Sequence, residues 1–183
     1  MKKPNAQLTH AGLYVRNIDA MVEFYCKHLA LVITDRGYMN ATELCFLSRS
    51  ENEHHQVVLA RIPDRLPSGP TTLNQMSFRL ATLADLQAFY RTLLPYDLPG
   101  MEPRHHGNSW SFYFFDPEGN KIEMYAVTAW QVKQPWRAPL DLLKPVDEIM
   151  AETDAYVREL EGARPLAEWQ QEMRERLNKQ EQA

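Results

Sequence analysis

The chain has 183 residues, of which 44% are hydrophobic, and this is enough to bury a full core in one compact body. Its 20 basic and 24 acidic residues are mixed along the sequence and give a net charge of -4. The sequence therefore predicts no basic surface for binding nucleic acid. No apolar run approaches the roughly 20 residues that cross a bilayer, and Met1 to Asn5 lead into no signal-peptide core, so we expect a cytoplasmic protein without a membrane partner.

The first predicted elements are a strand followed by a helix. Residues 8–15 alternate between polar and apolar side chains, which places His10, Gly12 and Tyr14 on one face of a strand. Residues 17–29 carry apolar side chains at helical spacing. Three further strand-like runs follow, at 31–39, 42–49 and 55–62. The first part of the chain therefore predicts a βαβββ unit.

The same pattern returns later in the chain. When the sequence is aligned with itself so that His10 falls on Gln75, Phe24-Tyr25 falls on Phe89-Tyr90 at the same offset. The second copy starts near Leu73, after a Pro-rich stretch at 63–70 that is typical of a linker. It ends in a predicted hairpin, with strands at 109–115 and 121–127 around a turn at 116–120. The repeat predicts two modules, 8–62 and 73–127, in one domain that spans 1–129.

The remaining residues, 130–183, form a predicted helical extension. Apolar side chains recur at helical spacing over 146–160 and again over 166–177, which indicates two amphipathic helices. We expect these helices to pack on the sheet or on a second subunit, and a homodimer is the assembly that we predict.

Polar side chains mark the face of the modules that lies opposite the helices. Gln75 and Ser77 share this face in the second copy, as His10 does in the first. Centring the hairpin on Glu118 sets Tyr113 across from Glu123, with Cβ atoms roughly 5 Å apart. A carboxylate on this face needs a compensating charge, and a divalent metal ion is one source of it.

These residues resemble the vicinal oxygen chelate superfamily between about Leu8 and Val127. The resemblance rests on His10 in the first strand, on the Phe-Tyr pair in each helix and on Asp-Pro-Glu-Gly-Asn-Lys-Ile-Glu at 116–123. It implies an α+β fold in which paired βαβββ modules form a curved mixed-sheet cup, the glyoxalase/bleomycin resistance/dioxygenase fold. Within the superfamily, the chain is most similar to type I extradiol dioxygenases.

That resemblance implies a metal site and three catalytic residues. It assigns His10 and Glu123 as metal ligands. It gives His55 a role in proton transfer, and it places His106 and Tyr113 beside the substrate. The neighbouring residues His54 and His105 are predicted to face solvent, because alternation points each of them away from its partner.

One position departs from the extradiol pattern. Gln75 stands where that family has its second metal-binding His. An amide oxygen is neutral, as imidazole is, but it is a harder and weaker donor, and glyoxalase I and epimerase sites include Gln ligands. Either Gln75 completes the site, or His55 does and restores two His and one carboxylate, the set expected for non-haem Fe(II).

The function implied by the resemblance is a dioxygenase that cleaves a catechol-like aromatic ring. The substrate would present two vicinal oxygens, and dioxygen would be the second reactant. The cofactor would be a divalent ion, with Fe(II) favoured and Mn, Ni or Zn as alternatives. Two other functions stay open: a non-redox enzyme of the glyoxalase I or fosfomycin-resistance type, and a cup that binds a small molecule without catalysis.

Overall fold

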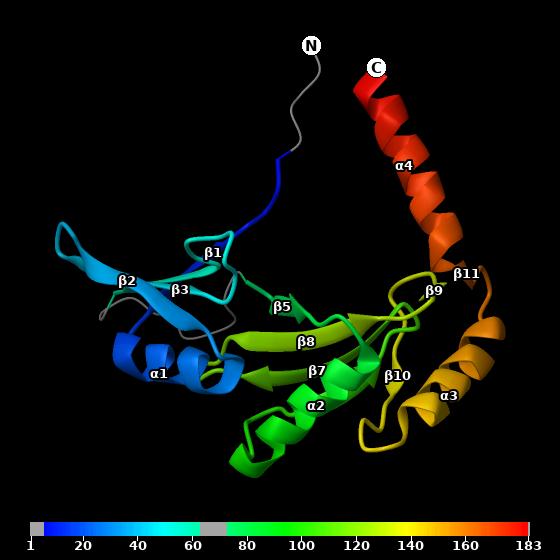
Figure 1. Ribbon diagram of the computed structural model, residues 1–183, viewed down its shortest axis with the longest axis horizontal. Coiled ribbons are helices and arrows are strands. Elements are labelled where there is room, and N and C mark those ends of the chain that lie inside the picture. The colour runs from blue at the N-terminus through cyan, green and yellow to red at the C-terminus, as the bar shows by residue number, and fades with distance from the viewer. Residues whose placement is uncertain (1–5, 63–72, 183) are drawn as a thin grey trace. The chain divides into compact units, whose positions relative to one another are not determined.

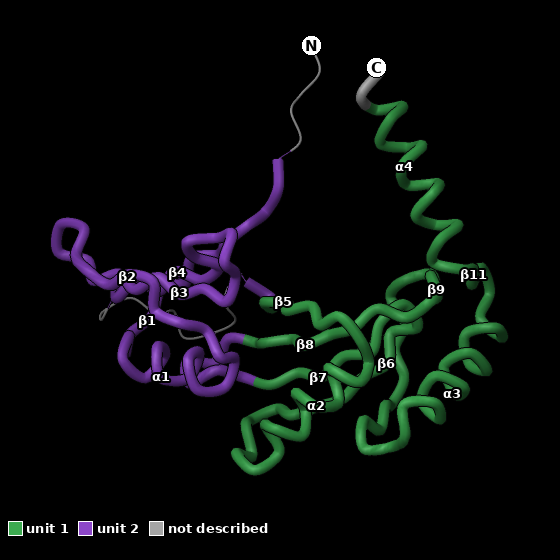
Figure 2. Tube along the Cα trace, viewed as in Figure 1, with its two compact units in different colours: residues 1–4, 75–114, 121–183 green, residues 5–74, 115–120 purple. Residues whose placement is uncertain are grey.

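The computed structural model describes residues 6–62 and 73–182, and the predicted linker at 63–70 lies outside this part. The described residues divide into two compact units, which Figure 2 shows in purple and green. The N-terminal unit, in purple, comprises 6–62, 73–74 and 115–120. The C-terminal unit, in green, comprises 75–114 and 121–182. Each unit is built on its own sheet.

The N-terminal unit holds one βαβββ module, as the sequence predicts (Figure 1). Its elements are β1 (Ala11–Val15), α1 (Ile18–Leu29), β2 (Val32–Met39), β3 (Thr42–Ser48) and β4 (Val57–Arg61). The strands lie in the order β1-β4-β3-β2, and β1 runs parallel to β4. Strand β1 is shorter than predicted, so His10 lies just before it.

Helix α1 is fixed to the N-terminal unit by its apolar side and by its N-terminus. Met21, Tyr25 and Leu29 recur at helical spacing and are buried. The Asn17 side chain accepts a hydrogen bond from the Ala20 amide. The amides that precede the helix donate to the Glu118 carboxylate, which lies in the turn at 116–120. This turn therefore stabilises a helix that lies far earlier in the chain.

The C-terminal unit holds the second module. Its elements are β5 (Met76–Arg79), α2 (Leu83–Leu93), a short 3-10 helix (Leu94–Tyr96), β6 (Glu102–His105), β7 (Ser109–Phe115), β8 (Lys121–Val127) and β10 (Ala138–Pro139). The strand order is β10-β6-β7-β8-β5, and β5 runs parallel to β8. In the N-terminal unit Ala11 pairs with Val57, and in the C-terminal unit Met76 pairs with Ile122. The two residues of the second pair follow those of the first pair by the offset that separates Gln75 from His10. This confirms the predicted repeat.

The residues after β8 return to the second sheet and then form two helices. β10 pairs with β6, and β9 (Trp130–Gln131) pairs with β11 (Arg164–Pro165). The helices are α3 (Val146–Arg158) and α4 (Leu166–Gln182), close to the predicted positions. Helix α3 buries Ile149, Thr153 and Val157. The boundary at residue 129 and the homodimer stay predictions.

The fold class is the predicted one, an α+β fold with two mixed sheets and a helical C-terminal extension. Alternation along β7 and β8 sends Phe112, Phe114 and Ile122 into the core of the C-terminal unit. Across residues 6–62 and 73–182, the helices are all too short or too polar to cross a bilayer.

Candidate functional site

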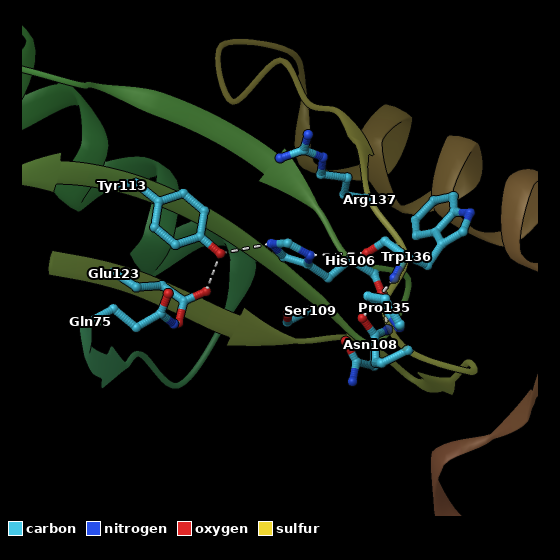
Figure 3. Close-up of a pocket in the computed structure, with 10 residues that line it drawn as sticks. Gln75, His106, Asn108, Ser109, Tyr113, Glu123, Pro135, Trp136 and Arg137 are labelled. Carbon is cyan, nitrogen blue, oxygen red and sulfur yellow. Dashed lines mark hydrogen bonds between the residues drawn. The ribbon is translucent and has the colours of Figure 1, made fainter. Parts of the chain in front are cut away.

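A pocket of about 610 Å³ opens on the C-terminal unit (Figure 3). Its walls come from β7, β8, the residues before β5 and the segment that leads into β10. The lining residues are Gln75, His106, Asn108, Ser109, Tyr113, Glu123, Gln134, Pro135, Trp136 and Arg137. Its size is typical of a site for a small organic molecule.

Glu123 lies in this pocket with a carboxylate that is buried and accepts three hydrogen bonds. The parallel pairing of β5 with β8 sets Ser77 beside Glu123. The carboxylate accepts hydrogen bonds from Ser77 Oγ at 2.5 Å, Gln75 Nε2 at 2.8 Å and the Tyr113 hydroxyl at 2.7 Å. All three donors are neutral, and Glu123 forms no ion pair with another described residue. A buried carboxylate without a charged partner attracts a cation.

Tyr113 connects Glu123 to His106. Its hydroxyl lies 2.7 Å from Glu123 Oε1 and 2.8 Å from His106 Nε2, as the dashed lines in Figure 3 show. Burial, and then the neighbouring Glu123, raise the pKa of Tyr113 well above its ordinary value. Tyr113 therefore keeps its proton at neutral pH. The predicted contact across the hairpin is confirmed.

His106 is held in place by the segment that follows β9. Its Nδ1 lies 3.1 Å from the carbonyl oxygen of Trp136, and since a carbonyl only accepts, Nδ1 carries the proton. Gln134 donates to the His106 carbonyl and accepts from the Trp136 amide. Next in the chain, Gly107 has a φ of 75°, and a Cβ there would lie 2.4 Å from a Val132 methyl group. Only glycine suits this turn, which aims His106 at Tyr113.

The donor set around Glu123 fits a divalent metal ion. Two oxygen ligands at right angles on one ion lie about 3 Å apart when each metal–oxygen distance is about 2.1 Å. The amide of Gln75 is 2.8 Å from Glu123 Oε2, and a half-turn of that amide replaces Nε2 by Oε1. A carboxylate and an amide oxygen suit a hard cation. Among His, Cys, Asp and Glu side chains in the described ranges, no three are grouped as a metal site.

The other two predicted site residues belong to the N-terminal unit. The rings of His10 and His55 lie edge to face with centroids 4.4 Å apart. His55 Nδ1 is 3.0 Å from His54 Nδ1, and His54 Nε2 is 2.9 Å from Asp35. Burial, then His10 and His54, lower the pKa of His55. His54 is exposed, as predicted. The convergence of His10 or His55 with Glu123 on one ion stays a prediction.

The prediction for His105 is wrong, because this side chain is 5% exposed. Its Nδ1 accepts from the Gly107 amide at 2.7 Å, and its Nε2 lies 2.9 Å from Thr153 Oγ1 on α3. Burial lowers the pKa of His105 to about 4, so the ring is neutral. Alternation correctly separates His105 from His106, but α3 rather than water covers the face that His105 occupies.

Nothing in the sequence indicates that the extension lines the pocket. Gln134, Trp136 and Arg137 reach it because β10 returns to pair with β6. This pairing is long-range and involves two residues of β10, so no periodic pattern predicts it. A Pro-containing stretch is the only signal at this position.

Comparison with known proteins identifies a family that shares this architecture. The family model of the Glyoxalase/Bleomycin resistance protein/Dioxygenase superfamily matches residues 7–124. The chain is 30% identical over 121 residues to biphenyl-2,3-diol 1,2-dioxygenase 2 of Rhodococcus globerulus, covering 64% of this chain and 61% of that protein. It is 32% identical over 123 residues to biphenyl-2,3-diol 1,2-dioxygenase 3 of the same organism, covering 64% and 62%. The chain thus spans about three fifths of these relatives.

Solved structures share the fold at lower identity. A glyoxalase/bleomycin resistance protein/dioxygenase domain from Frankia sp. matches with a TM-score of 0.59 and 18% identity, covering 68% of this chain and 94% of that one. Glyoxalase I from Leishmania major matches with a TM-score of 0.53 and 13% identity, covering 85% and 97%. A fosfomycin resistance protein from Listeria monocytogenes matches with a TM-score of 0.52 and 16% identity, covering 68% and 96%. The chain belongs to the glyoxalase/bleomycin resistance protein/dioxygenase superfamily.

Proposed function

We propose that this chain is a metal-dependent dioxygenase that cleaves a catechol-like aromatic ring by extradiol chemistry. The observation that carries the proposal is the chain of contacts from Glu123 through Tyr113 to His106 along one wall of a pocket. It combines a carboxylate suited to a metal with a hydroxyl and an imidazole suited to a substrate oxygen. The likeness to two biphenyl-2,3-diol 1,2-dioxygenases supports this choice of reaction.

Glu123 and His10 would hold the ion, with Gln75 or His55 as the third ligand. Fe(II) is the favoured ion, and Mn, Ni or Zn are alternatives. When bound, the metal supplies Lewis-acid charge and the redox chemistry that lets a catechol react with dioxygen. Gln75 and Ser77 hold the Glu123 carboxylate in a fixed orientation before any ion binds.

The remaining residues bind the substrate and move its protons. His55 has a lowered pKa and is neutral at pH 7, so it can take a proton from a substrate hydroxyl and return it later. Tyr113 keeps its hydroxyl proton, and His106 is fixed by Trp136. Tyr113 can donate its proton to a substrate oxygen as negative charge develops on it, and His106 can donate through Nε2 when both of its ring nitrogens are protonated.

The direct test is oxygen consumption by protein reconstituted with Fe(II) under anaerobic conditions and then mixed with catechol or biphenyl-2,3-diol in aerated buffer. We expect oxygen uptake matched by a yellow ring-opened product. Protein that contains Fe(II) and binds a catechol but consumes no oxygen with a range of catechols would contradict the proposal.

Two substitutions separate metal binding from proton transfer. His55→Ala should keep the metal and lose turnover, whereas Glu123→Ala should lose both. Metal content is measured by elemental analysis of protein made without a His tag. Equal metal loss in the two variants would instead make His55 the third ligand and leave Gln75 as a support for Glu123.

A non-redox reaction of the glyoxalase I or fosfomycin-resistance type is the second candidate. The observation that favours it is Gln75, whose amide touches Glu123 in the position where an oxygen ligand would stand. Such an enzyme would use its ion as a Lewis acid and consume no oxygen. The third candidate is a cup that binds a small molecule without catalysis. Tight binding of an aromatic ligand by metal-free protein, with no turnover either with or without metal, would indicate it.

A further inference from the structure

We propose that Arg137 forms an anion-binding subsite, and that the substrate is a catechol that also carries a carboxylate. This inference deepens the proposed function and rests on it for the orientation of the ring. It follows from where Arg137 lies, from its lack of an acidic partner and from the carboxylate that Glu123 adds to the same pocket.

The backbone on both sides of Arg137 is fixed. Trp136 accepts a hydrogen bond from His106 through its carbonyl and donates one to Gln134 through its amide. Ala138, on the other side, pairs with His105 in the antiparallel ladder of β10 with β6. The Cα of Arg137 is therefore set by a sheet and by the site itself. Its side chain is exposed.

The side chain of Arg137 lines the same pocket as Tyr113 and Glu123. Figure 3 shows its guanidinium pointing away from the indole of Trp136 and toward the half of the pocket that holds Tyr113. An arginine that lines this pocket is available to an anionic group on a molecule bound there.

The guanidinium of Arg137 has no partner in the described part of the protein. Within residues 6–62 and 73–182 it makes no ion pair and no side-chain hydrogen bond. Arg36 and Arg164, by contrast, form ion pairs with Glu43 and Glu172. An unpaired arginine beside a pocket keeps all its donors available in the forked geometry that matches a carboxylate.

The pocket is lined by groups of opposite charge. Glu123 suits a cation and the vicinal oxygens, and among the described residues that line the pocket only Arg137 is a Lys or Arg. A catechol without a substituent would leave Arg137 unused. A catechol that also carries a carboxylate matches both.

The test compares two ligands of the same shape. Binding of 3,4-dihydroxybenzoate and of 3,4-dihydroxybenzamide is measured by calorimetry, on the protein as purified and again after loading with Fe(II). We expect the carboxylate to bind roughly tenfold more tightly than the amide, the lower range for a charge-assisted pair near solvent. The preference should shrink as NaCl is raised, because salt screens exposed charges.

Variants show whether Arg137 is responsible. Arg137→Gln and Arg137→Met should bind both ligands with equal affinity. Arg91→Gln is the matched control, since it removes the same charge from an exposed position on α2. It should keep the preference. Circular dichroism checks that each variant is folded.

Each outcome decides the subsite separately from the reaction. Equal affinities in the wild type, a preference that survives Arg137→Gln, or failure to bind either ligand would overturn the subsite. Oxygen uptake without any preference would overturn the subsite and leave the dioxygenase proposal standing. A preference that depends on Arg137, in protein that consumes no oxygen, would keep the subsite and remove the dioxygenase proposal.

Discussion

The two modules share a backbone plan but differ in the polarity of one face. Glu123 of β8 occupies the position that Val58 holds in β4, and its neighbour across the parallel pair is Ser77, where the first module has Gly12. Phe46 lies opposite Val58, whereas Tyr113 contacts Glu123. The duplicated strands provide equivalent positions, and different residues at these positions give the second module the carboxylate and hydroxyl on which the proposed function depends.

The largest effect that tests this contrast is expected from Tyr113→Phe, which gives the second module the ring found at Phe46. Removing the hydroxyl takes one donor from Glu123 and the link to His106. Turnover should fall about 100-fold, in the range for loss of one donor to a developing charge. Steady-state oxygen uptake measures this loss.

Metal content is the control for the Tyr113 variant. Gln75 and Ser77 still hold Glu123, so the ion should remain bound. If Tyr113→Phe lost its metal as completely as Glu123→Ala, the role of Tyr113 would be to build the metal site.

The next effect concerns α3, an element that the first module lacks. Thr153 Oγ1 is the partner of both His105 Nε2 and Trp110 Nε1, at 2.9 and 2.8 Å. Thr153→Val keeps the shape and leaves these two buried donors unsatisfied. The free energy of unfolding should fall by about 2–3 kcal/mol, measured by urea denaturation. Thr153→Ser restores the oxygen and should recover most of this loss; an equal loss in both variants would assign the effect to packing.

The free energy of unfolding should depend on pH because His105 is buried. The pKa of His105 is lowered to about 4 by burial, against an ordinary value of about 6.5. Between these values the unfolded chain binds more protons than the folded one, so stability is complete above about pH 6.5 and falls as the pH drops toward 4. One proton gives a slope of at most about 1.4 kcal/mol per pH unit.

The measurement is urea unfolding at several pH values between 7 and 5. His105→Asn should lower the slope over this window. A slope that His105→Asn does not alter would mean that other groups cause the dependence.

The smallest effect compares the two equivalent helix tyrosines. Tyr25 is fully buried and donates to Asp116 Oδ2 at 3.1 Å, while Tyr90 is half-buried and stacks edge to face on Phe112. Tyr25→Phe should cost about 1 kcal/mol of unfolding free energy, because Asp116 keeps its bonds from Asn120. Tyr90→Phe should change it by less than about 0.5 kcal/mol. Equal losses would contradict the difference between the helices.

Local patterns predicted the parts of this fold that depend on short-range spacing. The helices begin at Ile18 and Leu83, equivalent positions of the repeat, because each starts after a capping side chain and carries its apolar residues at the same spacing. The contact of Tyr113 with Glu123 was predictable because the turn at 116–120 fixes the hairpin register.

The features that the sequence did not predict depend on distant segments. Alternation separates His105 from His106 but does not say that α3 would cover one face. The approach of Trp136 and Arg137 to the pocket depends on β10, whose two residues carry no strand signal. The proposed metal ligands come from both units, so their convergence on one ion stays a prediction, which the variants above test.

The turn at 116–120 has a consequence for attempts to divide the molecule. It links β7 to β8, yet its Glu118 accepts from the amides of Arg16 and Asn17 and its Asp116 accepts from Tyr25. A fragment that begins after the linker would carry this loop without the helix it secures, and a fragment that ends at the linker would leave the amides of Arg16 and Asn17 and the hydroxyl of Tyr25 without these partners. Neither half is a self-sufficient piece, so a working split protein should need both parts expressed together.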